Sequence, residues 1–176
     1  DELEKVVREL EELAKEILKK LDEIIRDTER LVREAVKRLR ELIERTRRLM
    51  DEVRKKVRDK DLLKEVKERL DRSHEEAERL VRKLKKDLED SNRRAEELVR
   101  RVEEELKDLV RRLRGTDEKV MRELEDTVRR VREELRKLLE EHNRRVKKVL
   151  EDLDRLLDEH RKIVEDIKRD LDRREK

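Results

Sequence analysis

Apolar residues recur along this chain with a period of eighteen residues. Leu3, Leu21 and Leu39 begin three successive blocks of apolar positions that repeat one another almost residue by residue. Because an α-helix has about 3.6 residues per turn, eighteen residues make five whole turns, and the apolar positions stay on one face of a straight helix. A strict heptad repeat would instead require left-handed supercoiling. The pattern therefore predicts a long, nearly untwisted helix over about residues 2–58.

Two further segments repeat with the same period, one beginning at Leu62 and the other at Val120. On a helical projection, the second apolar stripe is centred roughly 150° away from the first, so one continuous helix could not bury both stripes against one core. A break is therefore expected between Val57 and Leu62. Residues 59–61 include two aspartates, either of which is a suitable N-cap.

The second break is predicted at residues 114–118. Gly115 is the sole glycine of the chain and suits the left-handed position that follows a helix. Thr116 is expected to cap the next helix, and Asp117 and Glu118 supply an acidic first turn. Short connections make neighbouring helices antiparallel. The fold class predicted is all-α: a single up-down-up antiparallel three-helix bundle over residues 1–176, with nearly straight helices at about 2–58, 61–114 and 117–174, each roughly 80 Å long.

The composition favours long helices over disorder. Of the 176 residues, 61% are charged and none is aromatic, but 55 basic residues nearly balance 52 acidic ones and proline is absent. Basic residues are interleaved with acidic ones along every segment and form no basic run, so a nucleic-acid surface is not expected. No apolar run is long enough for a membrane span. No cysteine is present, which excludes disulfide and thiolate chemistry. The chain is expected to be soluble and without a leader segment, with no native compartment and a cytoplasmic location on recombinant expression.

The uncharged polar side chains lie on or beside the apolar stripes, where water would not reach them. In two antiparallel helices, residues at the same height have a constant sum of residue numbers. Thr28 pairs with Ser91 under this rule, and Thr46 pairs with Ser73 with the same sum. Half of that sum is a residue number inside the first predicted connection. For the second and third helices, half of the corresponding sum is a residue number inside the second predicted connection. Two polar layers are predicted: layer one with Thr28, Ser91, Asn92, His142 and Asn143, and layer two with Thr46, Ser73, His74 and His160.

Grouping these side chains has an energetic reason. A buried hydroxyl, amide or imidazole without a partner costs about 1–3 kcal/mol, whereas neighbours in one layer can satisfy one another. A slipped register would separate the partners, so the layers would act against wrong packings. Thr127 has no partner in either layer.

The eighteen-residue repeat, the surface of Asp, Glu, Lys and Arg, and the Ser-His and Ser-Asn pairs resemble de novo designed helical bundles with buried hydrogen-bond networks on parametric backbones. The resemblance covers the whole chain. It implies a protein made for structural specificity, with no evolved activity. Thr127 and the lack of glycine in the first connection depart from that pattern.

No catalytic, cofactor or metal site is expected. His74 and His160 share layer two, but without cysteine or a carboxylate in that layer they fall short of the three or four ligands of a zinc site. Ser73 beside His74 would need an oxyanion hole, which uninterrupted helices do not provide.

The sequence therefore predicts a structural protein without enzymatic activity, in which the polar layers specify helix register. An alternative is a self-assembling or pH-responsive helical binding module whose core histidines destabilise it in acid. No partner is required under the first interpretation. A monomer is expected, and a homodimer is the second possibility.

Overall fold

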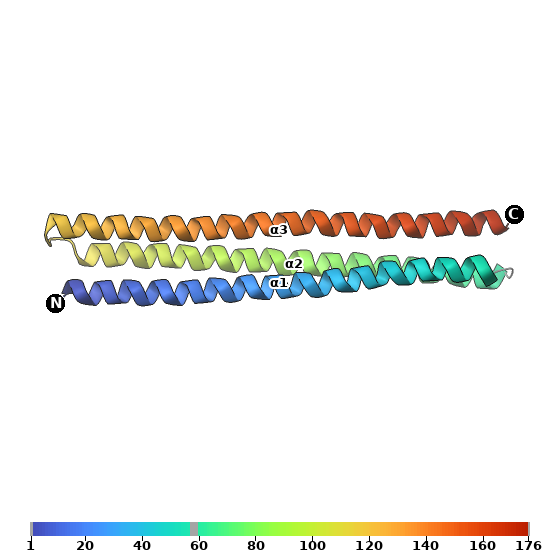
Figure 1. The fold of residues 1–176 in the computed structure, drawn as a ribbon, viewed down its shortest axis with the longest axis horizontal. Coiled ribbons are helices and arrows are strands. Elements are labelled where there is room, and N and C mark those ends of the chain that lie inside the picture. The colour runs from blue at the N-terminus through green and yellow to red at the C-terminus, as the bar shows by residue number, and fades with distance from the viewer. Residues whose placement is uncertain (1, 57–59, 176) are drawn as a thin grey trace. The chain divides into compact units, whose positions relative to one another are not determined.

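The computed structural model describes residues 2–56 and 60–175, and nearly all of them are helical. The helices are α1 (Glu2–Lys56), α2 (Lys60–Arg112) and α3 (Glu118–Glu175), and no strand occurs within these ranges (Figure 1). The all-α fold with three long helices is therefore confirmed. The first break is predicted between Val57 and Leu62. In the structure, α1 ends at Lys56 and α2 begins at Lys60, and the candidate cap Asp59 lies outside the described residues.

The connection between α2 and α3 contains the predicted left-handed glycine. Gly115 has a φ of 95°, a conformation that costs little only without a Cβ atom. The Thr116 backbone N–H donates to the Leu113 carbonyl at 3.2 Å, and the Thr116 hydroxyl donates to the same oxygen at 2.7 Å. The prediction that Thr116 caps α3 is wrong. Asp117 precedes α3 and its Oδ1 accepts from the Lys119 backbone N–H at 3.3 Å, the contact of an N-cap.

Segments of all three helices make up each of two compact units. Unit 1 contains Asp1–Glu29 and Leu88–Val146, and unit 2 contains Arg30–Asp87 and Lys147–Lys176. In unit 1, Leu10 of α1, Leu106 of α2 and Leu135 of α3 are buried in one apolar cluster. Burial of such side chains contributes about 1.5–3 kcal/mol each, which offsets the entropy lost on ordering the helices.

Unit 2 has a corresponding apolar cluster. Val53 of α1, Leu70 of α2 and Ile167 of α3 belong to it, and Leu70 is fully buried. All three occupy stripe positions of the eighteen-residue repeat. The repeat therefore identifies the side of each helix that packs against its neighbours.

The stripe of α1 is wider than the surface that its neighbours cover. Val7 is 38% exposed and Leu18 is 50% exposed, although both were expected to face the core. Leu62 on α2 is also exposed, at 41%. These residues lie on the flank of their stripes, where contact with two neighbouring helices ends.

Ion pairs between helices lie at the rim of each unit. In unit 1, Arg112 of α2 pairs with Glu9 of α1 at 2.6 Å. In unit 2, Arg47 of α1 pairs with Glu159 of α3 at 2.9 Å. Because these side chains remain about half exposed, each pair contributes on the order of 0–1 kcal/mol.

Candidate functional site

Layer two brings polar side chains of three helices into contact within unit 2. The His160 Nε2 atom of α3 lies 3.2 Å from the Thr46 hydroxyl of α1 and 3.2 Å from the Ser73 hydroxyl of α2. The two hydroxyl oxygens are 3.4 Å apart. His160 is fully buried and Thr46 is 2% exposed. The contact of Thr46 with His160 is therefore away from water, where an unpaired group would be costly, whereas Ser73 is half-buried at the edge of the cluster.

The other face of His160 meets His74. Their Nδ1 atoms are 3.2 Å apart, the ring planes differ by 7°, and the ring centroids are 5.4 Å apart. The centroid separation is close to the sum of the nitrogen–nitrogen distance and the two ring radii, so the nearly parallel rings lie edge to edge and one N–H can point at the other nitrogen. The remaining nitrogen of His74, Nε2, lies 2.9 Å from Glu78 Oε1 on the next turn of α2.

Burial changes the protonation of His160. Removal from water, together with the smaller effect of the His74 charge, lowers the pKa of His160 from 6.5 to about 4. His160 is therefore a neutral imidazole at pH 7, with one nitrogen that donates and one that accepts.

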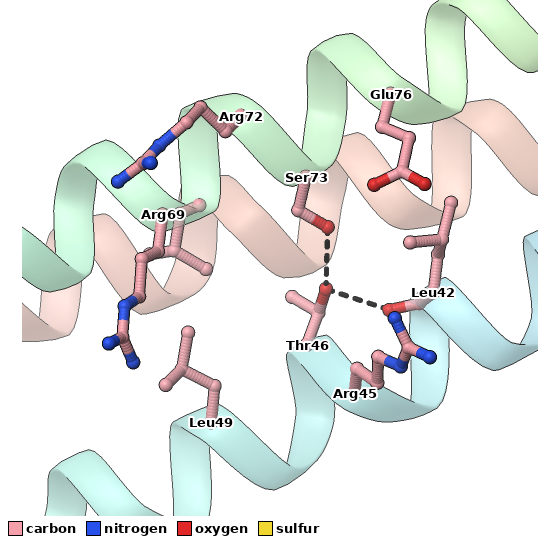
Figure 2. A pocket seen from close by; sticks show the side chains of 9 residues that line it. Leu42, Arg45, Thr46, Leu49, Arg69, Arg72, Ser73 and Glu76 are labelled. Carbon is pink, nitrogen blue, oxygen red and sulfur yellow. Dashed lines mark hydrogen bonds between the residues drawn. The ribbon is translucent and has the colours of Figure 1, made fainter.

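Next to this cluster, unit 2 has a shallow groove between α1 and α2 of about 400 Å³. Figure 2 shows the Thr46 and Ser73 hydroxyls pointing toward one another at the groove, with the Thr46 hydroxyl also bonded to the Leu42 carbonyl at 2.9 Å. Arg45, Arg69, Arg72 and Glu76 line the groove around them.

Layer one is only partly connected. In unit 1, the Thr28 hydroxyl of α1 lies 2.7 Å from the Ser91 hydroxyl of α2, and both residues are buried. Three buried atoms of the same predicted layer, Asn92 Oδ1, His142 Nε2 and Asn143 Oδ1, have no hydrogen-bond partner. The structure thus brings together two of the five predicted members through a hydrogen bond.

His142 resembles His160 in its burial. It is 4% exposed, and removal from water lowers its pKa, as does the charge of Arg145, while Glu29 acts in the opposite direction. Glu29 follows Thr28 in α1, so the influence of Glu29 is consistent with His142 lying near the height of Thr28.

Thr127 lies outside both layers. It is exposed, and its hydroxyl donates to the Glu123 carbonyl at 2.9 Å, one turn earlier in α3. The absence of a layer partner in the sequence is explained by this local bond.

No protein-family model matches the sequence, and no curated protein matches it. A solved structure described as a "Computationally designed three helix bundle" matches 98% of this chain and 90% of its own length, with a TM-score of 0.63 and 18% sequence identity. The chain shares the fold of that designed three-helix bundle. At this identity, the similarity concerns the fold and not the side chains of the polar layers.

One polar cluster of the bundle is absent from the predicted sites. Glu103 of α2 is 7% exposed in unit 1, and its carboxylate pairs with Arg132 Nη2 at 3.2 Å and Arg136 Nε at 2.7 Å, both on α3. Burial alone would raise the pKa of Glu103, but the hydrogen bonds and charges of Arg136 and Arg132 together lower it. The register rule places Glu103 and Arg132 at nearly the same height, since their sum of residue numbers is close to that of His74 and His160, but it does not single this pair out among the many charged residues of the two helices.

Across residues 2–56 and 60–175, no group of three or more His, Cys, Asp or Glu side chains is arranged to hold a metal ion. Within the same ranges, no helix combines the length and apolar character that a membrane crossing requires.

Proposed function

We propose that this protein is a designed structural protein without native biochemical activity, and that its two buried polar layers specify the register of the helices. The fold that it shares with a computationally designed three-helix bundle supports the first part. The contacts of Thr46, Ser73 and His160 support the second part.

The observation that carries the proposal is that each of the three helices supplies a member of layer two. Thr46 is on α1, Ser73 on α2 and His160 on α3, and each lies within hydrogen-bond distance of the other two. Sliding one helix by one turn would move its polar group by about 5.4 Å along the axis. That displacement breaks its bonds and leaves buried polar atoms unpaired, at about 1–3 kcal/mol each.

Apolar side chains alone discriminate less well between registers. The stripes repeat every eighteen residues and consist largely of Leu, Val and Ile, so a shifted helix still meets apolar partners of similar volume. A polar side chain at the same place meets an apolar one after the shift. The layers therefore raise the free energy of wrong registers more than they stabilise the right one.

A cysteine-pair experiment tests this role, since the chain has no cysteine of its own. Thr28 on α1 and Ser91 on α2 have short side chains whose hydroxyl oxygens are 2.7 Å apart in unit 1. The in-register pair is Thr28→Cys with Ser91→Cys, and the slipped pair is Thr28→Cys with Ala95→Cys. In the parent, the in-register pair should form its disulfide at least about tenfold faster, because Ala95 lies about one turn away from Ser91.

The same pairs are then measured in a variant whose layer-two hydroxyls and imidazole are replaced: Thr46→Val, Ser73→Ala and His160→Leu. Comparable rates for the two pairs would show that register has been lost. An unchanged preference for the in-register pair would overturn the proposed role of layer two, because apolar packing would then be sufficient.

A second candidate function is a response to acid. It is favoured by the burial of His160 and His142, because folding then favours the neutral imidazole of each. Both histidines would take up protons on unfolding below pH 6.5, so acid would destabilise the folded chain.

We further propose that the chain is a monomer at neutral pH. Exposed apolar side chains such as Val7 and Leu18 are few, and stable dimers bury far larger surfaces. Sedimentation at pH 7.5 and 5.0 should give a mass near 21.8 kDa. A mass near twice that value at either pH would favour self-assembly instead.

A further inference from the structure

Layer two continues beyond the three-helix contact into a longer chain of hydrogen bonds. From Glu78 the contacts run through His74 Nε2 at 2.9 Å, from His74 Nδ1 to His160 Nδ1 at 3.2 Å, and from His160 Nε2 to the Ser73 hydroxyl at 3.2 Å. One end is a carboxylate whose side chain is 43% exposed. The other end is the hydroxyl that lines the groove between α1 and α2 (Figure 2).

We propose that Glu78, His74, His160 and Ser73 form a proton relay with fixed tautomers, in which His74 carries its proton on Nε2, His160 carries its proton on Nδ1, and Glu78 is the positioning residue. This inference deepens the acid response proposed above and rests on the contacts of layer two. It assigns one donor and one acceptor to every contact along the relay.

The first argument comes from the hydroxyl end. The Thr46 hydroxyl donates its only proton to the Leu42 carbonyl at 2.9 Å, so it has no proton left for His160. The Ser73 hydroxyl is closer to His160 Nε2, at 3.2 Å, than to the Thr46 oxygen, at 3.4 Å. The carboxylate end, described next, requires the proton of His160 on Nδ1 when His74 is neutral. The Nε2 atom then accepts, and Ser73 is the hydroxyl that still has a proton to donate to it.

The second argument comes from the carboxylate end. A carboxylate only accepts hydrogen bonds, so the His74 nitrogen 2.9 Å from Glu78 must carry a proton. His74 Nδ1 is then free to accept from His160 Nδ1–H. The opposite arrangement, with the proton of a neutral His74 on Nδ1, would place two lone pairs against each other at Glu78.

The arrangement gives a path for a proton to reach the buried ring. A proton from the groove binds the Ser73 oxygen as the original Ser73 O–H bond breaks, and the original hydroxyl proton forms a new N–H bond at His160 Nε2. The Nδ1–H bond of His160 then breaks as its proton passes to His74 Nδ1, so one proton enters and one positive charge appears on His74, beside Glu78. The Ser73 hydroxyl ends with the arriving proton, which is directed away from Nε2.

Glu78 is the carboxylate that directs this charge. On α2 it contacts His74 directly. On α1, Arg45 lines the groove at the hydroxyl end of the relay, and Arg47 pairs with Glu159 of α3 at 2.9 Å. The carboxylate of Glu159 is therefore already paired and competes less than Glu78 for the positive charge.

Long-range ¹H–¹⁵N spectra of imidazole-labelled protein test the proposal at pH 7.5, because they distinguish protonated from unprotonated ring nitrogens. His74 should be the Nε2–H tautomer and His160 the Nδ1–H tautomer, each with a preference of about tenfold. Dominance of His74 Nδ1–H, of His160 Nε2–H, or of a doubly protonated His74 at this pH would overturn the assignment.

Variants of Glu78 test its positioning role. Glu78→Ala should reduce the tautomer preference of His74 to less than about threefold, whereas Glu78→Gln should keep it, because the amide oxygen still accepts from Nε2–H. Glu75→Ala is the matched control: Glu75 and Glu78 lie on the same helix and each pairs with an arginine four residues later. Unchanged spectra in Glu78→Ala would overturn the role of Glu78. The cysteine-pair assay measures register independently, so failure of the relay and failure of the proposed function are separate outcomes.

Discussion

Lowering the pH from 7.5 to 5.0 should destabilise this protein by about 2 kcal/mol through His160 alone. Burial, together with the charge of His74, lowers the pKa of His160 from 6.5 to about 4 in the folded chain. Above pH 6.5 the imidazole is neutral in both folded and unfolded states, so its contribution to stability is fully present. Between pH 6.5 and 4 only the unfolded state is protonated, and each pH unit costs about 1.4 kcal/mol.

The assay is guanidinium unfolding followed by far-UV circular dichroism at the two pH values, with the free energy taken from the midpoint and slope. His142 also has a lowered pKa and adds a loss of the same sign. His160→Gln isolates the contribution of His160, because an amide can donate and accept near Thr46 and Ser73 but does not titrate. At pH 5.0 most carboxylates remain ionised, which limits their contribution to the difference.

The variant should therefore lose about 2 kcal/mol less than the parent between pH 7.5 and 5.0. The comparison depends on the change with pH and not on the stability of the variant at either pH. If parent and His160→Gln lose the same free energy, burial of His160 does not couple folding to protonation, and the reasoning is refuted.

Three further substitutions test the packing and the polar clusters by the same unfolding assay at pH 7.5. Ser73→Ala should cost about 1–3 kcal/mol, because it leaves the buried His160 Nε2 atom without a donor. Thr127→Val, which removes an exposed hydroxyl bonded only to a carbonyl of its own helix, should cost less than about 0.5 kcal/mol; equal losses would contradict the cluster. Leu88→Ala removes a fully buried side chain and should cost about 2–5 kcal/mol. Leu18→Ala should cost less than about 1 kcal/mol, because the Leu18 side chain is 50% exposed in the parent; a large loss in Leu18→Ala would mean that Leu18 is covered in solution. Glu103→Gln should cost about 1–2 kcal/mol, because two charge-assisted bonds to partly exposed arginines weaken. This loss should shrink as the pH falls through the lowered pKa of Glu103; a pH-independent loss would contradict the role of the Glu103 charge.

The direction of this last pH dependence follows from the arginine pairs. The pKa of Glu103 is lowered in the folded chain, so its ionised form contributes stability above the unfolded carboxyl pKa. That stability is lost as the carboxylate is protonated on going to lower pH. The acid responses of Glu103 and of the two histidines therefore have the same sign but different pH ranges.

Helix geometry explains how much could be predicted from the sequence. The eighteen-residue repeat fixes which side of each helix is apolar, because five whole turns return a residue to the same face. The residue-number rule for antiparallel helices predicts the contact of Thr28 with Ser91, whose hydroxyl oxygens are 2.7 Å apart. It also predicts that His74 and His160 lie at one height, and their Nδ1 atoms are 3.2 Å apart.

The hydrogen bonds that form within each layer depended on side-chain rotamers and on the rotation of each helix about its axis. A shared height brings two side chains within several ångströms, but a hydrogen bond needs about 2.7–3.2 Å and a suitable angle. Asn92 and Asn143 share a predicted layer with His142, yet each of the three has a buried polar atom without a partner. The edge-to-edge contact of the two layer-two imidazoles likewise could not be obtained from residue spacing.

The sequence by itself determined the three helices, their apolar sides and the heights at which polar residues meet, because these depend only on the period of the α-helix and on short connections. The tertiary structure decided which groups are buried and paired. It left Val7 and Leu18 exposed, enclosed Glu103 between two arginines, and joined Glu78 to the histidines of layer two. These outcomes depend on how much of each helix surface is covered by the neighbouring helices, and the period of the repeat does not encode the extent of that coverage.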